Sequence, residues 1–191
     1  MTILICLAAL AVFFLLVMAV DCNRFVIRTY ECRMKNLKKD GRAVLLSDLH
    51  GKSFGKDNKR LLAAIDQLNP DMIWIAGDLY TCEKGADPHT AASLVERLAL
   101  KYPVYYGNGN HEQKTRLCCE DFGSIYQDYF DRMKRAGVRH LVNEKVFVPE
   151  FNMDIYGLEI GLGYYKKFQS ISMEEGYLDK LLGRCAPERA T

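Results

Sequence analysis

The sequence predicts an α/β fold built on a parallel β-sheet and preceded by one transmembrane helix. Its first 20 residues carry no charged side chain. After them, short apolar runs of strand length alternate with segments of helical period, in steps of about thirty residues. Repeated strand–helix–strand units of this kind are typical of a parallel sheet with helices on its faces.

The size and charge of the chain limit its organisation and its partners. With 191 residues it is long enough for one compact domain and a short appendage, and we expect an anchor over 1–21 and a domain over 22–191. Hydrophobic residues make up 49% and charged residues 26%, so a packed core is expected. A net charge of +2 lacks the basic excess of proteins that hold phosphate backbones by charge, so we expect no stable nucleic-acid partner.

The apolar segment at the N-terminus is long enough to cross a bilayer. At a helical rise of about 1.5 Å per residue it measures about 30 Å, the thickness of the hydrocarbon core. The alternative is a cleaved secretory signal, which has a basic stretch before the apolar run and a small-x-small site after it. No basic side chain precedes the run, and its exit reads Ala19-Val20-Asp21-Cys22, so we favour the anchor.

Residues after the anchor predict its orientation and compartment. Basic side chains follow within about twenty residues, where the positive-inside bias is counted. They are Arg24, Arg28, Arg33, Lys35, Lys38 and Lys39. The seven cysteines form no Cys-x-x-Cys pair and are odd in number, which favours free thiols in a reducing compartment. We therefore expect a single-pass protein of the cell membrane with its domain in the cytoplasm.

The elements of the domain follow from apolar runs and periodicity. Six runs have the length and composition of strands, at 25–30, 43–47, 72–76, 104–106, 146–148 and 154–156. Helical spacing is found at 61–68, where Asn69-Pro70-Asp71 ends the helix, at 91–100 and near 122–136. Trp74 lies inside a buried strand and is expected in the core.

Polar clusters directly follow three of the apolar strands. They read Ser-Asp-Leu-His-Gly at 47–51, Gly-Asp-Leu at 77–79 and Gly-Asn-Gly-Asn-His-Glu at 107–112. The carboxyl ends of parallel strands form the crevice where ligands bind, so the clusters should converge. Their Asp, His and Asn side chains suit Mn, Fe or Zn, and a carboxylate that reaches two ions holds them about 3.5 to 4 Å apart, a geometry for hydrolysing phosphate esters. Each cluster alone is a weak signal; order, spacing and placement together are strong.

At these residues the sequence resembles the calcineurin-like metallophosphoesterase family, whose pattern begins Asp-x-His, Gly-Asp, Gly-Asn-His-Asp/Glu. Asp48 and His50 match the first block, Gly77-Asp78 the second and 109–112 the third. The closer likeness is to a membrane-anchored bacterial branch that includes enzymes similar to UDP-2,3-diacylglucosamine hydrolases. The resemblance implies the N-terminal part of the family's αββα sandwich.

The resemblance also implies roles for the matching residues. Asp48 and His50 would bind the first of two divalent metal ions, Asp78 would bridge both, and Asn110 would bind the second. His111 would lie near the phosphoryl group as the catalytic acid or charge stabiliser. The implied reaction is hydrolysis of a phosphate or pyrophosphate ester by a metal-activated water, on a substrate that could be lipid-linked or a nucleotide.

The sequence departs from the family pattern in its last two blocks, a lone His and Gly-His-x-His. His89 and His140 match neither block, and we expect both to be surface or structural residues. The chain therefore resembles a C-terminally incomplete enzyme, either a fragment or a truncated gene product. The alternative function is a catalytically impaired, membrane-tethered α/β module. For 164–168, ordinary packing is expected, with contact to a membrane surface as the alternative.

Overall fold

The computed structural model describes residues 1–83, 85–166, 168, 169 and 171–190. The chain divides into two compact units, residues 1–32 and 33–191. Residues 23–32 are grouped with the N-terminal helix in the first of these units.

Helix α1, Thr2–Cys22, is the main element of the first unit. Its stretch Ile3–Cys22 has a mean hydropathy of 3.2 and is long and apolar enough to cross a membrane, by length and composition alone. The Asn23 side chain ends the helix by donating to the Ala19 carbonyl at 2.8 Å. The prediction of a strand over 25–30 is wrong, since residues 24–32 form neither helix nor strand. A β-branched run without a neighbouring strand has no partner for its backbone groups.

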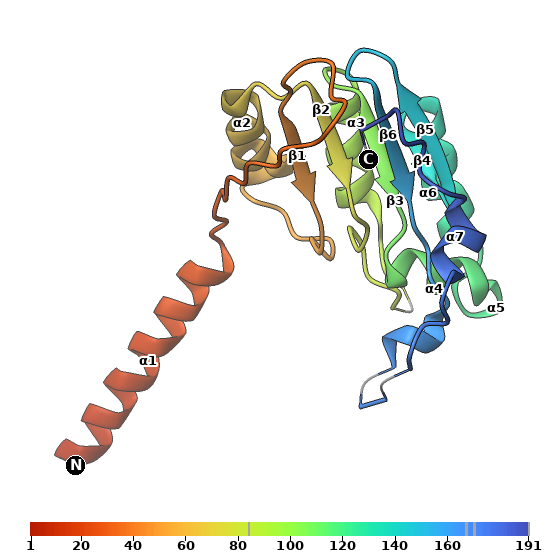
Figure 1. Cartoon of the computed structure of the whole chain (residues 1–191). Coiled ribbons are helices and arrows are strands. Elements are labelled where there is room, and N and C mark those ends of the chain that lie inside the picture. The colour runs from red at the N-terminus through yellow and green to blue at the C-terminus, as the bar shows by residue number, and fades with distance from the viewer. Residues whose placement is uncertain (84, 167, 170, 191) are drawn as a thin grey trace. The chain divides into compact units, whose positions relative to one another are not determined.

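A four-stranded parallel sheet forms the centre of the second unit (Figure 1). Its strands lie in the order β1 (Ala43–Leu46), β2 (Met72–Ile75), β3 (Val104–Gly107) and β4 (Arg139–Leu141). Strand β4 was not expected from the sequence, because it has only three residues and two of them are polar. The mixed α/β architecture with a parallel sheet is confirmed.

Amphipathic helices cover one face of this sheet. The three longest are α2 (Lys59–Leu68), α3 (His89–Ala99) and α6 (Ile125–Arg135). Helices α3 and α6 pack on each other and on β3 and β4. The remaining helical segments are η1 (Lys56–Asn58), α4 (Asn110–Leu117), α5 (Cys119–Phe122), η2 (Leu162–Tyr165) and α7 (Tyr177–Leu182).

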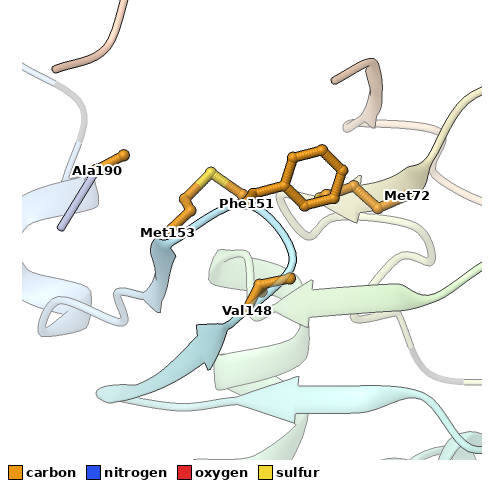
Figure 2. Packing of buried hydrophobic residues seen from close by; sticks show 5 residues of the cluster. All are labelled: Met72, Val148, Phe151, Met153 and Ala190. Atoms are coloured by element: carbon orange, nitrogen blue, oxygen red, sulfur yellow. The ribbon is translucent and has the colours of Figure 1, made fainter. Parts of the chain in front are cut away.

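An antiparallel hairpin packs on the other face of the sheet. Its strands are β5 (Glu144–Val148) and β6 (Met153–Gly157). Side chains of the hairpin form an apolar cluster with the start of β2 and with a residue near the C-terminus, as Figure 2 shows. The cluster consists of Met72, Val148, Phe151, Met153 and Ala190, with Trp74 packed against it only partly buried.

The hairpin leaves part of this face in solvent. Leu45 of β1 stands in register with Trp74 of β2, and Trp74 with Tyr105 of β3, so these side chains share one face. Trp74 and Tyr105 contact the hairpin cluster, whereas Leu45 is 62% exposed. The second layer therefore covers β2, β3 and the start of β1 at Ala43, but leaves Leu45 of β1 in solvent.

Candidate metal centre

The site lies in the loops that follow β1, β2 and β3, at the carboxyl edge of the sheet. Backbone hydrogen bonds join the first loop to the second. The Asp48 amide donates to the Gly77 carbonyl at 3.2 Å, and the His50 amide donates to the Asp78 carbonyl at 3.0 Å. These bonds bring two polar clusters together that are about thirty residues apart in the chain.

Side chains from all three loops meet at this edge. Potential ligand atoms of His50, Asp78 and His111 lie within 4.8 Å of one another. The Asp48 Oδ1 is 3.8 Å from the His50 Nε2, and the His50 and His111 rings meet edge to face at 4.8 Å. Asn110 is the first residue of α4, directly before His111. Four of the residues expected at the site, Asp48, His50, Asp78 and His111, thus lie close together, and His111 lies within the group of potential ligands. Asn110 precedes His111 in the chain.

Three of these residues have a left-handed backbone. Their φ angles are 54° at Asp48, 48° at His50 and 53° at Asp78. Asp, Asn and His adopt this region more readily than other side chains that bear a Cβ. The tight loops therefore depend on the same residue types that provide the potential ligands.

Two glycines allow the second and third loops to touch. A Cβ on Gly109 would lie 2.3 Å from the Asp78 Oδ1, and a Cβ on Gly77 would lie 1.9 Å from the Gly109 amide nitrogen. Gly77 also has a φ of 76°. Both contacts are far too short for any side chain, so these glycines set how closely Asp78 approaches the start of α4.

Glu112 holds this junction together from within the protein. Its carboxylate is fully buried and accepts from the amides of Asp78 (2.8 Å), Leu79 (3.0 Å) and Gly109 (3.0 Å) and from the Tyr106 hydroxyl (2.9 Å). Burial raises the pKa of Glu112, and these donors oppose that effect because they favour the ionised form. Glu112 is the last residue of the Gly-Asn-His-Glu motif at 109–112, and no role was predicted for it. Its place three residues after a helix N-cap is the signal of a capping box.

A hydrogen bond indicates which ring nitrogen of His111 carries the proton. The Cys82 amide donates to the His111 Nδ1 at 2.9 Å, so Nδ1 must carry a lone pair. In the neutral ring the proton then resides on Nε2, which makes Nε2 a donor and leaves no lone pair there for a metal. This tautomer is assigned from the bond. The arrangement favours His111 as a donor to a substrate oxygen over His111 as a ligand.

A buried polar network supports the third loop from behind. The Asn108 Nδ2 donates to the Glu159 Oε2 at 2.6 Å, and the Asn108 Oδ1 accepts from the His140 Nε2 at 2.8 Å. Glu159 also pairs with Arg116. Asn108 lies in the predicted polar cluster at 107–112 without a predicted role, and Glu159 was not predicted, since only the fold brings residues 51 positions apart into contact.

The two remaining histidines lie outside the group of potential ligands. His140 stacks on Phe130 at 3.7 Å, and burial, aided by the charge of Arg116, lowers its pKa to about 4. His89 is exposed at the start of α3. His140 is thus a structural residue that holds Asn108 within the buried network, in line with its predicted surface or structural role.

The donor set fits a divalent metal ion. One carboxylate and one imidazole, Asp48 and His50, lie close enough to share an ion, and the Asp78 carboxylate is beside them. Carboxylate and imidazole ligands of this kind suit Mn, Fe and Zn. The Asp78 Oδ1 accepts from the His111 amide at 2.9 Å, which fixes the orientation of this carboxylate without using all of its lone pairs.

A parallel α/β sheet with such a donor set at its carboxyl edge defines a metallophosphoesterase domain. The family model for calcineurin-like phosphoesterases matches residues 41–182, and the chain belongs to that family. The matched range begins just before β1 and ends at the last residue of α7. The resemblance based on the three motifs is thereby confirmed.

Two curated proteins are similar to the chain. A zebrafish (Danio rerio) protein named "Transmembrane protein with metallophosphoesterase domain" is 31% identical over 117 residues, which cover 59% of this chain and 25% of that protein. An uncharacterized metallophosphoesterase of Campylobacter jejuni is 31% identical over 143 residues, covering 71% of this chain and 36% of that protein. The chain therefore spans between a quarter and somewhat over a third of the length of these relatives. No solved structure matches the chain significantly.

Proposed function

We propose that this protein hydrolyses a phosphate or pyrophosphate ester with the help of two divalent metal ions, Mn, Fe or Zn. The observation that carries the proposal is the convergence of His50, Asp78 and His111 at the carboxyl edge of the sheet, within a chain of the phosphoesterase family. Bound ions would neutralise phosphate oxygens and make hydroxide available near neutral pH.

Each residue of the site has a distinct proposed role. Asp48 and His50 would hold the first ion, Asn110 would hold the second, and the Asp78 carboxylate would contribute to both. The short bonds that fix the Asp78 backbone and carboxylate support a bridging role, because a bridging group needs a fixed position. Glu112 keeps Asp78 and Gly109 in register without touching the substrate.

His111 acts on the substrate through its Nε2. The bond from the Cys82 amide keeps Nδ1 unprotonated and so presents Nε2–H to a phosphoryl or leaving-group oxygen. The Nε2–H donates a hydrogen bond that stabilises negative charge on the leaving oxygen, and a solvent water supplies the proton that this oxygen takes up, so the ring stays neutral throughout. The Cys82 amide is thus a positioning group for the Nε2–H.

The proposal places the enzyme on a membrane. Helix α1 is long and apolar enough to span a bilayer, and the zebrafish relative is by name a transmembrane protein. The basic residues after α1 favour a cytoplasmic domain in the cell membrane. A membrane location suits a lipid-linked substrate, although a nucleotide or other soluble phosphodiester fits the same donor set.

Metal content and hydrolysis test the proposal together. We expect the Mn-loaded chain to hydrolyse bis-p-nitrophenyl phosphate slowly, and Asp78→Asn to lower both the bound Mn and the rate at least tenfold. His89→Ala is the control, since His89 is exposed and outside the site, and should change neither. An Asp78→Asn variant with full activity would contradict the assigned roles.

A second candidate is a catalytically impaired, membrane-tethered module. It is favoured by the small size of the ligand group that the described residues form, which consists of His50, Asp78 and His111. Measured metal content separates the two candidates: two ions per chain support the enzyme, and none supports the module.

A further inference from the structure

The segment that follows β6 lies beside the metal centre. The Gln113 Nε2 donates to the Ile160 carbonyl at 2.9 Å, and η2 packs on α4, the helix that begins at Asn110. This segment therefore packs against the helix that begins at the metal centre.

The same segment exposes large apolar side chains. We define the apolar loop by the exposed residues Tyr165, Phe168, Ile171, Met173 and Leu178. Phe168 is fully exposed, so the ordinary packing expected for 164–168 is wrong at this residue. These exposed apolar side chains lie within fourteen residues of sequence, and exposed apolar surface of this kind indicates contact with a partner or a membrane.

The N-terminal helix favours a membrane over a protein partner as the surface that this loop contacts. Residues 23–32 connect α1 to the second unit, and ten extended residues span at most about 35 Å. A bilayer that holds α1 therefore stays close to the folded unit at a high effective concentration. Under this tether, even a few apolar side chains are sufficient for a stable second contact.

We propose that the apolar loop inserts into the lipid surface that holds α1 and turns the metal centre toward the lipid headgroups. Phe168 and Ile171 enter the interface, and the neighbouring Lys166 ammonium meets lipid phosphates. The inference rests on the membrane anchor of the proposed function. It adds a second, orienting contact and makes phosphate esters at the bilayer surface the accessible substrates.

Tryptophan quenching in the full chain tests this contact. The chain has one native tryptophan, Trp74, so the wild type provides the background signal. Phe168→Trp reports on the loop. Leu100→Trp is the matched control, because Leu100 is 85% exposed and precedes β3, at the opposite end of the sheet from the site. Both sites are exposed, so both variants should fold, as circular dichroism would check.

The two variants are reconstituted in phosphatidylcholine and phosphatidylglycerol vesicles that contain brominated acyl chains. We expect the added tryptophan at position 168 to be quenched at least twofold more than that at position 100. Equal quenching, or stronger quenching at position 100, would overturn the proposal. Release of the wild-type chain by carbonate would overturn the anchor and this inference with it. Metal content is measured separately, so failure of the metal site is distinguishable from failure of the membrane contact.

Discussion

Glu112 joins the second and third loops and strand β3 through one buried carboxylate, and its replacement by an amide is informative. In Glu112→Gln the side chain keeps one acceptor oxygen, and its NH₂ group faces backbone amides that also donate. A buried donor facing a donor leaves both unsatisfied, at a cost of about 3 kcal/mol. We expect the thermal midpoint to fall by roughly 6 to 12 °C.

Circular dichroism of the detergent-solubilised chain measures this change. Glu120→Gln is the control, because Glu120 is exposed on α5 and should leave the midpoint within about 1 °C. A midpoint unchanged in Glu112→Gln would show that Glu112 is already protonated at neutral pH.

His140 couples the stability of the domain to acid. Its pKa is lowered to about 4 in the folded chain, from a model-peptide value near 6.5, so between these values the unfolded chain binds more protons. Stability therefore falls as the pH decreases from about 6.5 to about 4, and remains unaffected by this group above pH 7. We expect a loss of about 2 kcal/mol in the free energy of unfolding.

Urea unfolding at pH 7 and at pH 4.5 checks the effect of His140. His140→Gln keeps a donor for Asn108 but does not titrate, so its stability should vary less with pH than that of the wild type. His89→Gln is the control, since His89 is exposed and should retain the wild-type dependence. Identical pH dependence in His140→Gln would refute this assignment.

At the scale of elements, the β5–β6 hairpin depends on one aromatic side chain. Phe151 is 3% exposed, packs in the cluster of Figure 2 and lies under the Lys39 ammonium at 4.4 Å. Phe151→Ala should lower the free energy of unfolding by about 3 kcal/mol, because it removes buried surface and leaves a cavity. Phe147→Ala, at a site that is 38% exposed, should cost about 1 kcal/mol. Urea titrations that give equal losses would contradict the importance of this cluster.

The sequence pattern predicted those elements whose own residues form a continuous apolar run or a helical apolar period. The strands at 43–47, 72–76 and 104–106 are continuous apolar runs, and each corresponds to a strand of the parallel sheet. Strand β4 could not be predicted this way, because its pairing with β3 depends on the neighbouring strand and not on its own polar residues. The run at 25–30 shows the reverse, since its β-branched residues find no partner strand.

The site was predictable to the extent that its residues follow strand ends. Asp48, His50, Asp78, Asn110 and His111 were all expected at this edge from order and spacing. The supporting carboxylates Glu112 and Glu159 were given no role, because their function depends on contacts across more than thirty residues of sequence. The direction of the His111 ring likewise depends on the Cys82 amide, which no local pattern reveals.

At the scale of the whole molecule, we expect α1 to determine where the protein resides. We expect the chain to sediment with membranes and to resist carbonate extraction, because a helix of this length and hydropathy is stable in a bilayer. Deletion of residues 1–21 should release the remainder, as immunoblots of membrane and soluble fractions would detect. A double substitution Leu10→Lys and Phe14→Lys should also release it, since both charges fall inside the apolar stretch. Recovery of the intact wild-type chain in the soluble fraction would contradict this prediction.

The left-handed backbone at Asp48, His50 and Asp78 restricts how the sequence can change at this edge. If each codon were randomised and the variants sorted for folding alone, Asn, Gly and Asp should be recovered, because these residues tolerate a positive φ. A second sort for bound Mn should keep only carboxylates and imidazoles. Asparagine is therefore the replacement that removes the charge and keeps the loop, whereas valine or isoleucine would lose both together. Substitutions that accumulate at these positions during evolution should therefore be to asparagine or glycine. Such substitutions would remove metal binding at the carboxyl edge of the sheet and leave the fold intact.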